Sequence, residues 1–166
     1  MPFVFGILVL ILSACGSKSV RYEPSVGPNR HSVAIIFIPG FYGTALADAQ
    51  TGERYFLTAM SSLFSRTPLA LVEPDLGVAG ARPLRADGVL MHLRIIPGIY
   101  SVDIYGKALD FLNEKFGNEA EIVPFEYDWR QEISQNTRQL DQLVRGFKAK
   151  GISRVLLVAH SMGGLI

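Results

Sequence analysis

The chain has 166 residues, which is enough for a single domain with one modest core. Its 16 basic and 15 acidic residues give a net charge of +1, and no basic stripe or block stands out. Proteins that bind nucleic acid gather Lys and Arg on one face, so we expect no nucleic-acid partner.

Residues 1–14 are typical of a signal peptide. Residues 3–12 form an apolar run that is too short for a transmembrane helix, which takes about 20 residues, and small residues follow the run. Leu-Ser-Ala-Cys, ending at Cys15, resembles the bacterial lipobox, in which the peptide is cut before a Cys that then carries a lipid. Cys15 is the only cysteine, so no disulfide competes for it. The alternative is a buried N-terminal strand with an incidental thiol.

A lipid on Cys15 predicts that the protein is anchored in the bacterial cell envelope and has a membrane as a partner. Gly16, directly after the Cys, resembles a signal for delivery to the outer membrane, on its periplasmic face. Residues 15–32 contain Pro24, Gly27 and Pro28, a composition typical of a flexible linker. We therefore expect ordered structure to begin at Val33.

Residues 33–38 (VAIIFI) predict a strand that is buried on both faces of a parallel sheet. The strand ends at a glycine-rich loop that contains Pro39, Gly40 and Gly43, and α/β sheets bind ligands at the carboxyl ends of their strands. In acyl-transfer enzymes of this fold, a backbone N–H of this loop binds the oxyanion, which assigns Phe41 as one donor. The alternative is a plain turn that ends the strand.

Residues 45–103 have no steady hydrophobic period, because prolines and glycines interrupt them, yet they remain apolar. A stretch of about 60 such residues between core elements predicts a cap inserted over the site, suited to a lipid acyl chain. The alternative is loosely packed surface helix and loop. His92, within this stretch, is expected in a short strand as a structural histidine.

From residue 105 onward, helix and strand patterns alternate. Apolar residues at helical spacing predict helices over 105–116 and 133–147, each followed by a glycine stop signal. Residues 121–127 predict the strand between them, although Pro124 lies inside it. This alternation predicts the α/β class, a parallel sheet with helices on both faces.

The last residues contain a candidate nucleophile. Residues 155–158 (VLLV) predict a second strand buried on both faces, and this strand leads into Ala-His-Ser-Met-Gly. The five residues are a variant of the Gly-x-Ser-x-Gly nucleophile elbow, a strained turn that raises a Ser hydroxyl above the edge of the sheet. Ser161 is therefore the predicted nucleophile, and the backbone N–H of Met162 is the second oxyanion donor. The alternative is a chance match in a loop.

The other elbow residues also have expected roles. Residues two positions from the Ser must be small, since the following helix folds across the strand; Gly163 meets this requirement, and Ala159 departs from it by one methyl group. Gly164 begins an apolar restart that supports a helix. We expect the His160 side chain to point away from the nucleophile and to give packing or polar support.

Four blocks, in this order along the chain, resemble the lecithin:cholesterol acyltransferase family. They are residues 39–46 (PGFYGTAL), 94–98 (RIIPG), 127–130 (YDWR) and 159–163 (AHSMG). The resemblance spans residues 33–166 and implies an α/β-hydrolase fold. It matches Ser161 to the nucleophile and Phe41 and Met162 to the oxyanion positions. The YDWR block looks structural in the family. We expect no cofactor and no metal ligand among these residues, and the sequence leaves a metal requirement of the full-length protein open.

In that family an Asp and a His follow the nucleophile, and this sequence holds no counterpart of them. We therefore expect residues 33–166 to be the N-terminal part of an α/β-hydrolase domain, truncated after the elbow and inactive by itself. The expected function of the full-length protein is serine-dependent acyl transfer on a phospholipid or acylglycerol, as an O-acyltransferase or as a phospholipase or esterase.

Two alternatives remain open. The chain could be complete and serve as a lipid-tethered binding or structural protein that has lost catalysis. It could also belong to a lipase from another branch of the α/β-hydrolases.

Overall fold

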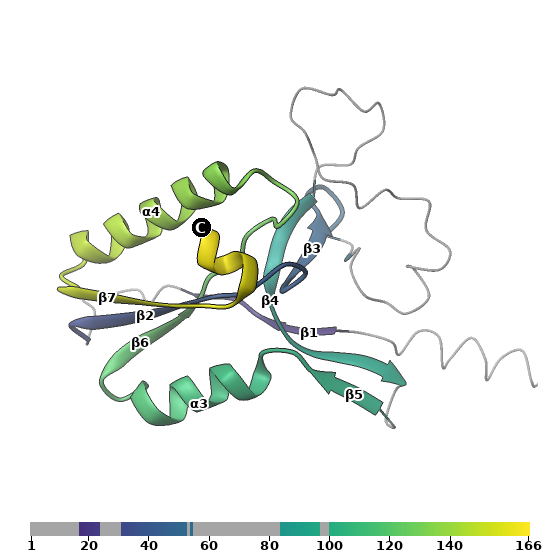
Figure 1. The fold of residues 1–166 in the computed structure, drawn as a ribbon, viewed down its shortest axis with the longest axis horizontal. Helices are drawn as coiled ribbons and strands as arrows, with labels where there is room; N and C mark the ends of the chain where they lie inside the picture. The colour runs from purple at the N-terminus through teal and green to yellow at the C-terminus, as the bar shows by residue number, and fades with distance from the viewer. Residues whose placement is uncertain (1–16, 24–30, 53, 55–83, 97–99) are drawn as a thin grey trace, which may run out of the picture.

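The computed structural model describes residues 17–23, 31–52, 54, 84–96 and 100–166. They form an α/β arrangement of two sheets with helices packed on one of them (Figure 1). In chain order the elements are β1 (Ser17–Val20), β2 (Val33–Ile38), β3 (Thr44–Asp48), β4 (Leu84–Ile96), β5 (Tyr100–Asp103), α3 (Gly106–Phe116), β6 (Ala120–Pro124), α4 (Ile133–Ala149), β7 (Arg154–Ala159) and the 3₁₀ helix η1 (Ser161–Leu165).

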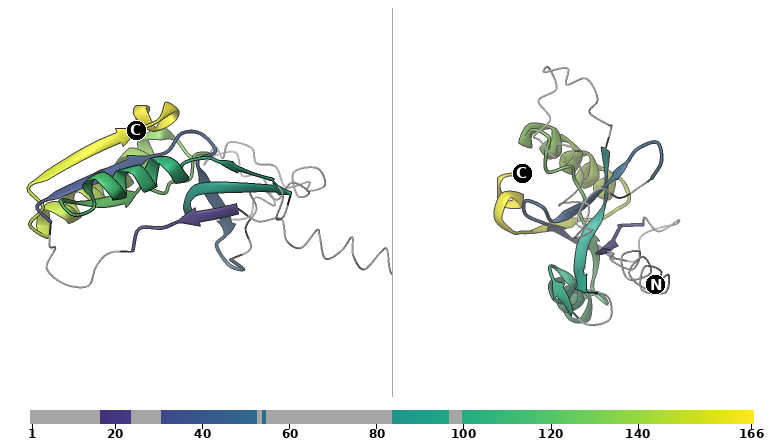
Figure 2. Two further views of the ribbon diagram at one scale, coloured as in Figure 1. Left: turned by 90° about the horizontal axis from the view of Figure 1, so that it is seen from below. Right: turned by 90° about the vertical axis from the view of Figure 1, so that its right-hand side faces the viewer.

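The parallel sheet has the order β6-β2-β7, so β2 is its centre. Successive side chains of a strand point to opposite faces, and the two helices cover these two faces of β2. Ile36 and Ile38 pack in one cluster with Leu140 and Phe147 of α4. Ile35 and Phe37 pack in the other with Leu109 and Leu112 of α3. The helices accordingly lie on opposite sides of the sheet in both Figure 1 and Figure 2.

The sequence predicted this part of the fold well. The predicted strand 33–38 is β2, the predicted helices are α3 and α4, and Pro124 is tolerated because it is the last residue of β6. Burial of the last strand was predicted wrongly: Leu156 is 45% and Leu157 54% exposed in β7. Among the described strands, β7 pairs only with β2, so its other edge and much of its side-chain surface face solvent.

The second sheet is antiparallel and has the order β1-β4-β3, with β5 also paired to β4. It corrects two expectations. Ser17–Val20, expected within a linker, form β1, and Tyr22 packs its ring 5.7 Å from that of Phe147. The expected irregular cap has regular strands at both ends. It begins with β3, which is fully buried, and its later part contains β4, which is 13 residues long. Residues 1–16, including Cys15, and about half of the expected cap, 55–83, lie outside the described residues.

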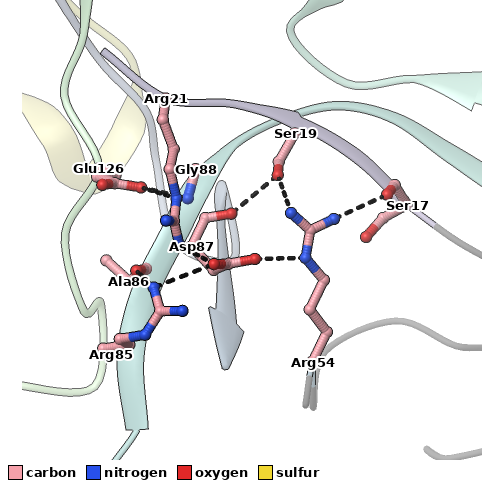
Figure 3. A network of polar contacts seen from close by, with 9 residues as sticks. All are labelled: Ser17, Ser19, Arg21, Arg54, Arg85, Ala86, Asp87, Gly88 and Glu126. Carbon is pink, nitrogen blue, oxygen red and sulfur yellow. Dashed lines mark hydrogen bonds and ion pairs between the residues drawn. The ribbon is translucent and has the colours of Figure 1, made fainter. Parts of the chain in front are cut away.

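A cluster of ion pairs attaches β1 to β4 (Figure 3). The guanidinium groups of Arg21, Arg54 and Arg85 surround the buried carboxylate of Asp87. Arg54 also donates to Ser19 Oγ at 2.9 Å, and Ser19 Oγ donates to the Asp87 carbonyl at 2.8 Å. One carboxylate therefore links side chains from distant parts of the chain, which explains why a polar segment becomes a strand.

No helix in the described ranges is both long enough and apolar enough to cross a membrane.

We expect Asp87→Asn to lower the free energy of unfolding by about 2 kcal/mol, because it removes the charge that three guanidinium groups share. The effect is smaller than for a fully buried pair, since the three arginine side chains are 39 to 44% exposed. Urea denaturation measures it. Asp141→Asn, in an exposed ion pair within α4, is the control and should leave the midpoint unchanged. Equal midpoints for all three proteins would contradict the assigned role of Asp87.

Candidate active site

Ser161 lies at a sharp turn directly after β7. His160 is still extended, with φ −119° and ψ 134°, whereas Ser161 has φ +53° and begins η1. A non-glycine residue in this left-handed region costs about 1–3 kcal/mol, and such strain collects at functional sites. Ser161 is exposed. The turn thus places an exposed serine at the carboxyl end of a parallel strand, and its role as nucleophile stays a prediction.

The loop after β2 lies against this turn. Ile38 and Ala159 are partners in the β2–β7 register, and the His160 N–H donates to the Ile38 carbonyl at 3.0 Å. A Cβ at Gly40 would lie 2.9 Å from Ser161 Cβ and 3.0 Å from His160 Nδ1. The glycine is therefore required by close contact with the candidate nucleophile.

A turn shapes the rest of this loop. The Gly43 N–H donates to the Gly40 carbonyl at 2.9 Å, and Tyr42 has φ +60°. A Cβ at Gly43 would lie 2.6 Å from Pro39 Cβ and 2.9 Å from the Gly40 carbonyl oxygen. Pro39, Gly40 and Gly43 thus make one tight turn that ends beside the elbow.

The two glycines of the elbow differ in their surroundings. A Cβ at Gly163 would lie 2.6 Å from the Ile38 carbonyl oxygen and 2.5 Å from that of Pro39, so η1 rests directly on the end of β2. A Cβ at Gly164 would meet nothing within 4 Å. Ala159 is exposed, so its methyl group has room. The close approach that the elbow pattern requires is therefore made at Gly163.

The two residues predicted as oxyanion donors come directly after Ser161 and after Gly40, which lies against Ser161. Met162 follows Ser161 and packs its side chain against the core on the α4 side. Phe41 follows Gly40, and its exposed ring lies 5.0 Å from the ring of buried Trp129. Their roles as oxyanion donors stay predictions.

Two tyrosines contact the loop, and sequence reasoning missed both roles. Tyr127 Oη donates to the Pro39 carbonyl at 2.7 Å, and Tyr105 Oη accepts the Gly40 N–H at 2.9 Å. Tyr105 Oη also lies 2.9 Å from His160 Nδ1, so the His160 ring has the polar contact that was expected of it. Tyr127 lies inside the YDWR block, which was a usable signal, whereas Tyr105 looked only like one position of a helical repeat.

The rest of the YDWR block is internal structure. Arg130 donates twice to the Asp128 carboxylate, from Nε at 2.9 Å and from Nη2 at 2.6 Å, and both side chains are buried. Trp129 Nε1 donates to the Thr44 carbonyl at 3.1 Å, which joins the block to β3. Among the contacts described, the Asp128 carboxylate and the Arg130 guanidinium bond each other and neither bonds Ser161.

Other candidate groups add little to the site. His92, expected as structural, lies on β4 with Nε2 3.5 Å from Asp103 Oδ1. In the part of the chain that the structure describes, no three His, Cys, Asp or Glu side chains gather in a way that could hold a metal ion.

We expect Gly163→Ala to lower the free energy of unfolding by about 1–3 kcal/mol, because its methyl group would overlap two backbone carbonyls that cannot move aside easily. Gly164→Ala is the matched control, one residue away, and should be close to neutral. Thermal or urea denaturation of the two variants makes the comparison. A Gly164→Ala variant as unstable as Gly163→Ala would contradict the close approach seen here.

Comparison with known proteins finds a family match over the C-terminal part of the chain. The model of the lecithin:cholesterol acyltransferase family matches residues 94–166, which run from the end of β4 through the elbow. An uncharacterized protein of Saccharomyces cerevisiae is 25% identical over 136 residues, 80% of this chain; the chain spans only 20% of that relative. No solved structure matches the chain. Residues 94–166, which include the candidate nucleophile and the YDWR block, thus match the model of the lecithin:cholesterol acyltransferase family.

Proposed function

We propose that the protein containing this chain transfers acyl groups of lipid esters through an acyl-enzyme on Ser161. The family points to lipid acyltransferase or esterase chemistry in general. The observation that carries the finer proposal is the strained, exposed Ser161, whose φ is +53° and whose Cβ is closely approached by the loop after β2.

The reaction would proceed in two halves. Ser161 Oγ attacks the ester carbonyl carbon while a base takes its proton, and the backbone N–H groups of Phe41 and Met162 bind the oxyanion of the tetrahedral intermediate. The alcohol leaves with that proton and the acyl group stays on Ser161. Water then resolves the acyl-enzyme in a hydrolase, and a second alcohol does so in an O-acyltransferase.

The base and its orienting acid are part of the proposal. In α/β-hydrolases a His and an Asp or Glu follow the Ser in chain order. The chain spans a fifth of its yeast relative. We propose that both of these triad residues lie in protein sequence outside this chain. The 166 residues alone should therefore have little activity.

Two aromatic side chains beside the site suit a lipid substrate. Phe41 and Tyr42 are 45% and 42% exposed, with ring centroids 4.1 Å apart, and both contact Trp129 edge to face. Aromatic surface of this kind favours an acyl chain over a polar substituent. The acyl donor is therefore proposed to be a phospholipid or an acylglycerol.

A fluorophosphonate probe should label the full-length protein, and Ser161→Ala should abolish the labelling and lower kcat on a lipid ester by about 10⁴-fold or more. Ser134→Ala is the control, because this exposed serine on α4 bonds only Glu132 among the contacts described. Persistent labelling of Ser161→Ala would exclude it as the nucleophile. Labelled phospholipid with and without an added alcohol distinguishes transfer from hydrolysis.

We further propose that the protein is attached to a membrane of the bacterial cell envelope through a lipid on Cys15. The support is the resemblance of residues 12–15 to a lipobox.

Metabolic labelling with a radioactive fatty acid should mark the wild-type protein, and Cys15→Ser should remove the label and release the protein from the membrane fraction. Ser13→Ala serves as control, since position 13 carries no thiol. Incorporation of the label into Cys15→Ser would contradict the anchor.

A further inference from the structure

A single peptide unit of the loop after β2 is held at both ends by tyrosine hydroxyls. The Pro39 carbonyl accepts from Tyr127 Oη at 2.7 Å, and the Gly40 N–H donates to Tyr105 Oη at 2.9 Å. This carbonyl and this N–H belong to the same planar amide, on opposite sides of it. The plane cannot rotate without breaking one of the two bonds.

Tyr105 also joins this loop to the elbow. A tyrosine hydroxyl has one proton to donate and lone pairs to accept. Since the Gly40 N–H can only donate, Tyr105 Oη accepts that bond and keeps its proton for His160 Nδ1, 2.9 Å away. This assignment makes His160 Nδ1 an acceptor and leaves the ring proton on Nε2. One hydroxyl therefore bonds both the loop after β2 and the turn after β7.

Both tyrosine rings are themselves fixed by packing. The Tyr127 ring is fully buried and stacks on Phe125 at 5.9 Å. Burial, with a smaller contribution from Tyr105, raises the pKa of the Tyr127 phenol, so it stays protonated and able to donate. The Tyr105 ring packs edge to face on Phe37 of β2 at 5.1 Å.

The need for such a clamp follows from the glycine at position 40. Contact with Ser161 leaves no room for a Cβ there, and glycine is the residue with the greatest backbone freedom. An oxyanion donor, however, must be held about 2.7–3.1 Å from the developing charge, and its value lies in being fixed before the reaction. The backbone N–H of Phe41 comes directly after this flexible residue.

We propose that Tyr105 and Tyr127 are positioning residues that fix the Pro39–Gly40 peptide and so aim the Phe41 N–H at the oxyanion. The inference rests on the proposed function, because it assigns the clamp to the oxyanion site of that reaction. The tyrosines touch neither substrate nor nucleophile in this role. They act through the loop.

The test compares Tyr105→Phe with Tyr100→Phe in the full-length protein, using p-nitrophenyl butyrate as substrate. Tyr105→Phe removes the acceptor of the Gly40 N–H and the donor to His160, and should lower kcat by about 10- to 100-fold with KM within about twofold. Tyr100 is 56% exposed on β5, and its variant should match the wild type. Tyr127→Phe should repeat the loss of kcat from the other end of the peptide.

A second measurement reads the clamp without turnover. Hydrogen exchange of the Gly40 amide should be faster in Tyr105→Phe by about tenfold or more, and unchanged in Tyr100→Phe. Wild-type kcat or unchanged exchange in Tyr105→Phe would overturn the inference while leaving Ser161 as nucleophile. If the wild-type protein shows no turnover, or if its turnover persists in Ser161→Ala, the proposed function is overturned, and the inference with it.

Discussion

The parallel pairing of β2 with β7 is the constraint on which the candidate site depends. It places Ile38 opposite Ala159, so both strands end at the same edge of the sheet and their loops must share one small volume. Gly163 then packs on the carbonyls of Ile38 and Pro39 at the end of β2, and Gly40 packs on Ser161. A shift of one residue in this register would turn every side chain of β7 to the other face and separate these contacts.

The same pairing explains why glycines and tyrosines have different roles at this site. Glycine is needed where the two backbones meet, because any side chain would collide, but it leaves the loop without rigidity. The rings of Tyr105 and Tyr127 are fixed by packing, and their hydroxyl groups restrain the loop through hydrogen bonds. The parallel sheet brings the loops together, and hydrogen bonds to Tyr105, which directly precedes α3, and from the YDWR block hold the loop after β2 in one orientation.

Sequence reasoning succeeded where local pattern decides structure. A continuous apolar run located β2, which is buried on both faces, and helical spacing located α3 and α4, which each bury one stripe. It failed for β1, whose pairing with β4 and ion pairs with Asp87 join residues about 70 positions apart and leave no local pattern. It also missed Tyr105, because an apolar ring at helical spacing hides the direction of its hydroxyl.

The YDWR block shows why residues that mark a family need not carry its chemistry. Asp128 is a buried carboxylate, which is the kind of group that serves as the acid of a catalytic triad. Yet its two oxygens accept from Arg130, its own backbone carbonyl accepts from Asn136, and it is 4% exposed. A carboxylate whose charge is already neutralised by a bidentate guanidinium has little left with which to orient a histidine. The block instead fixes Trp129 on β3 and Tyr127 on the loop beside Ser161, so it acts on the site by holding backbone in place.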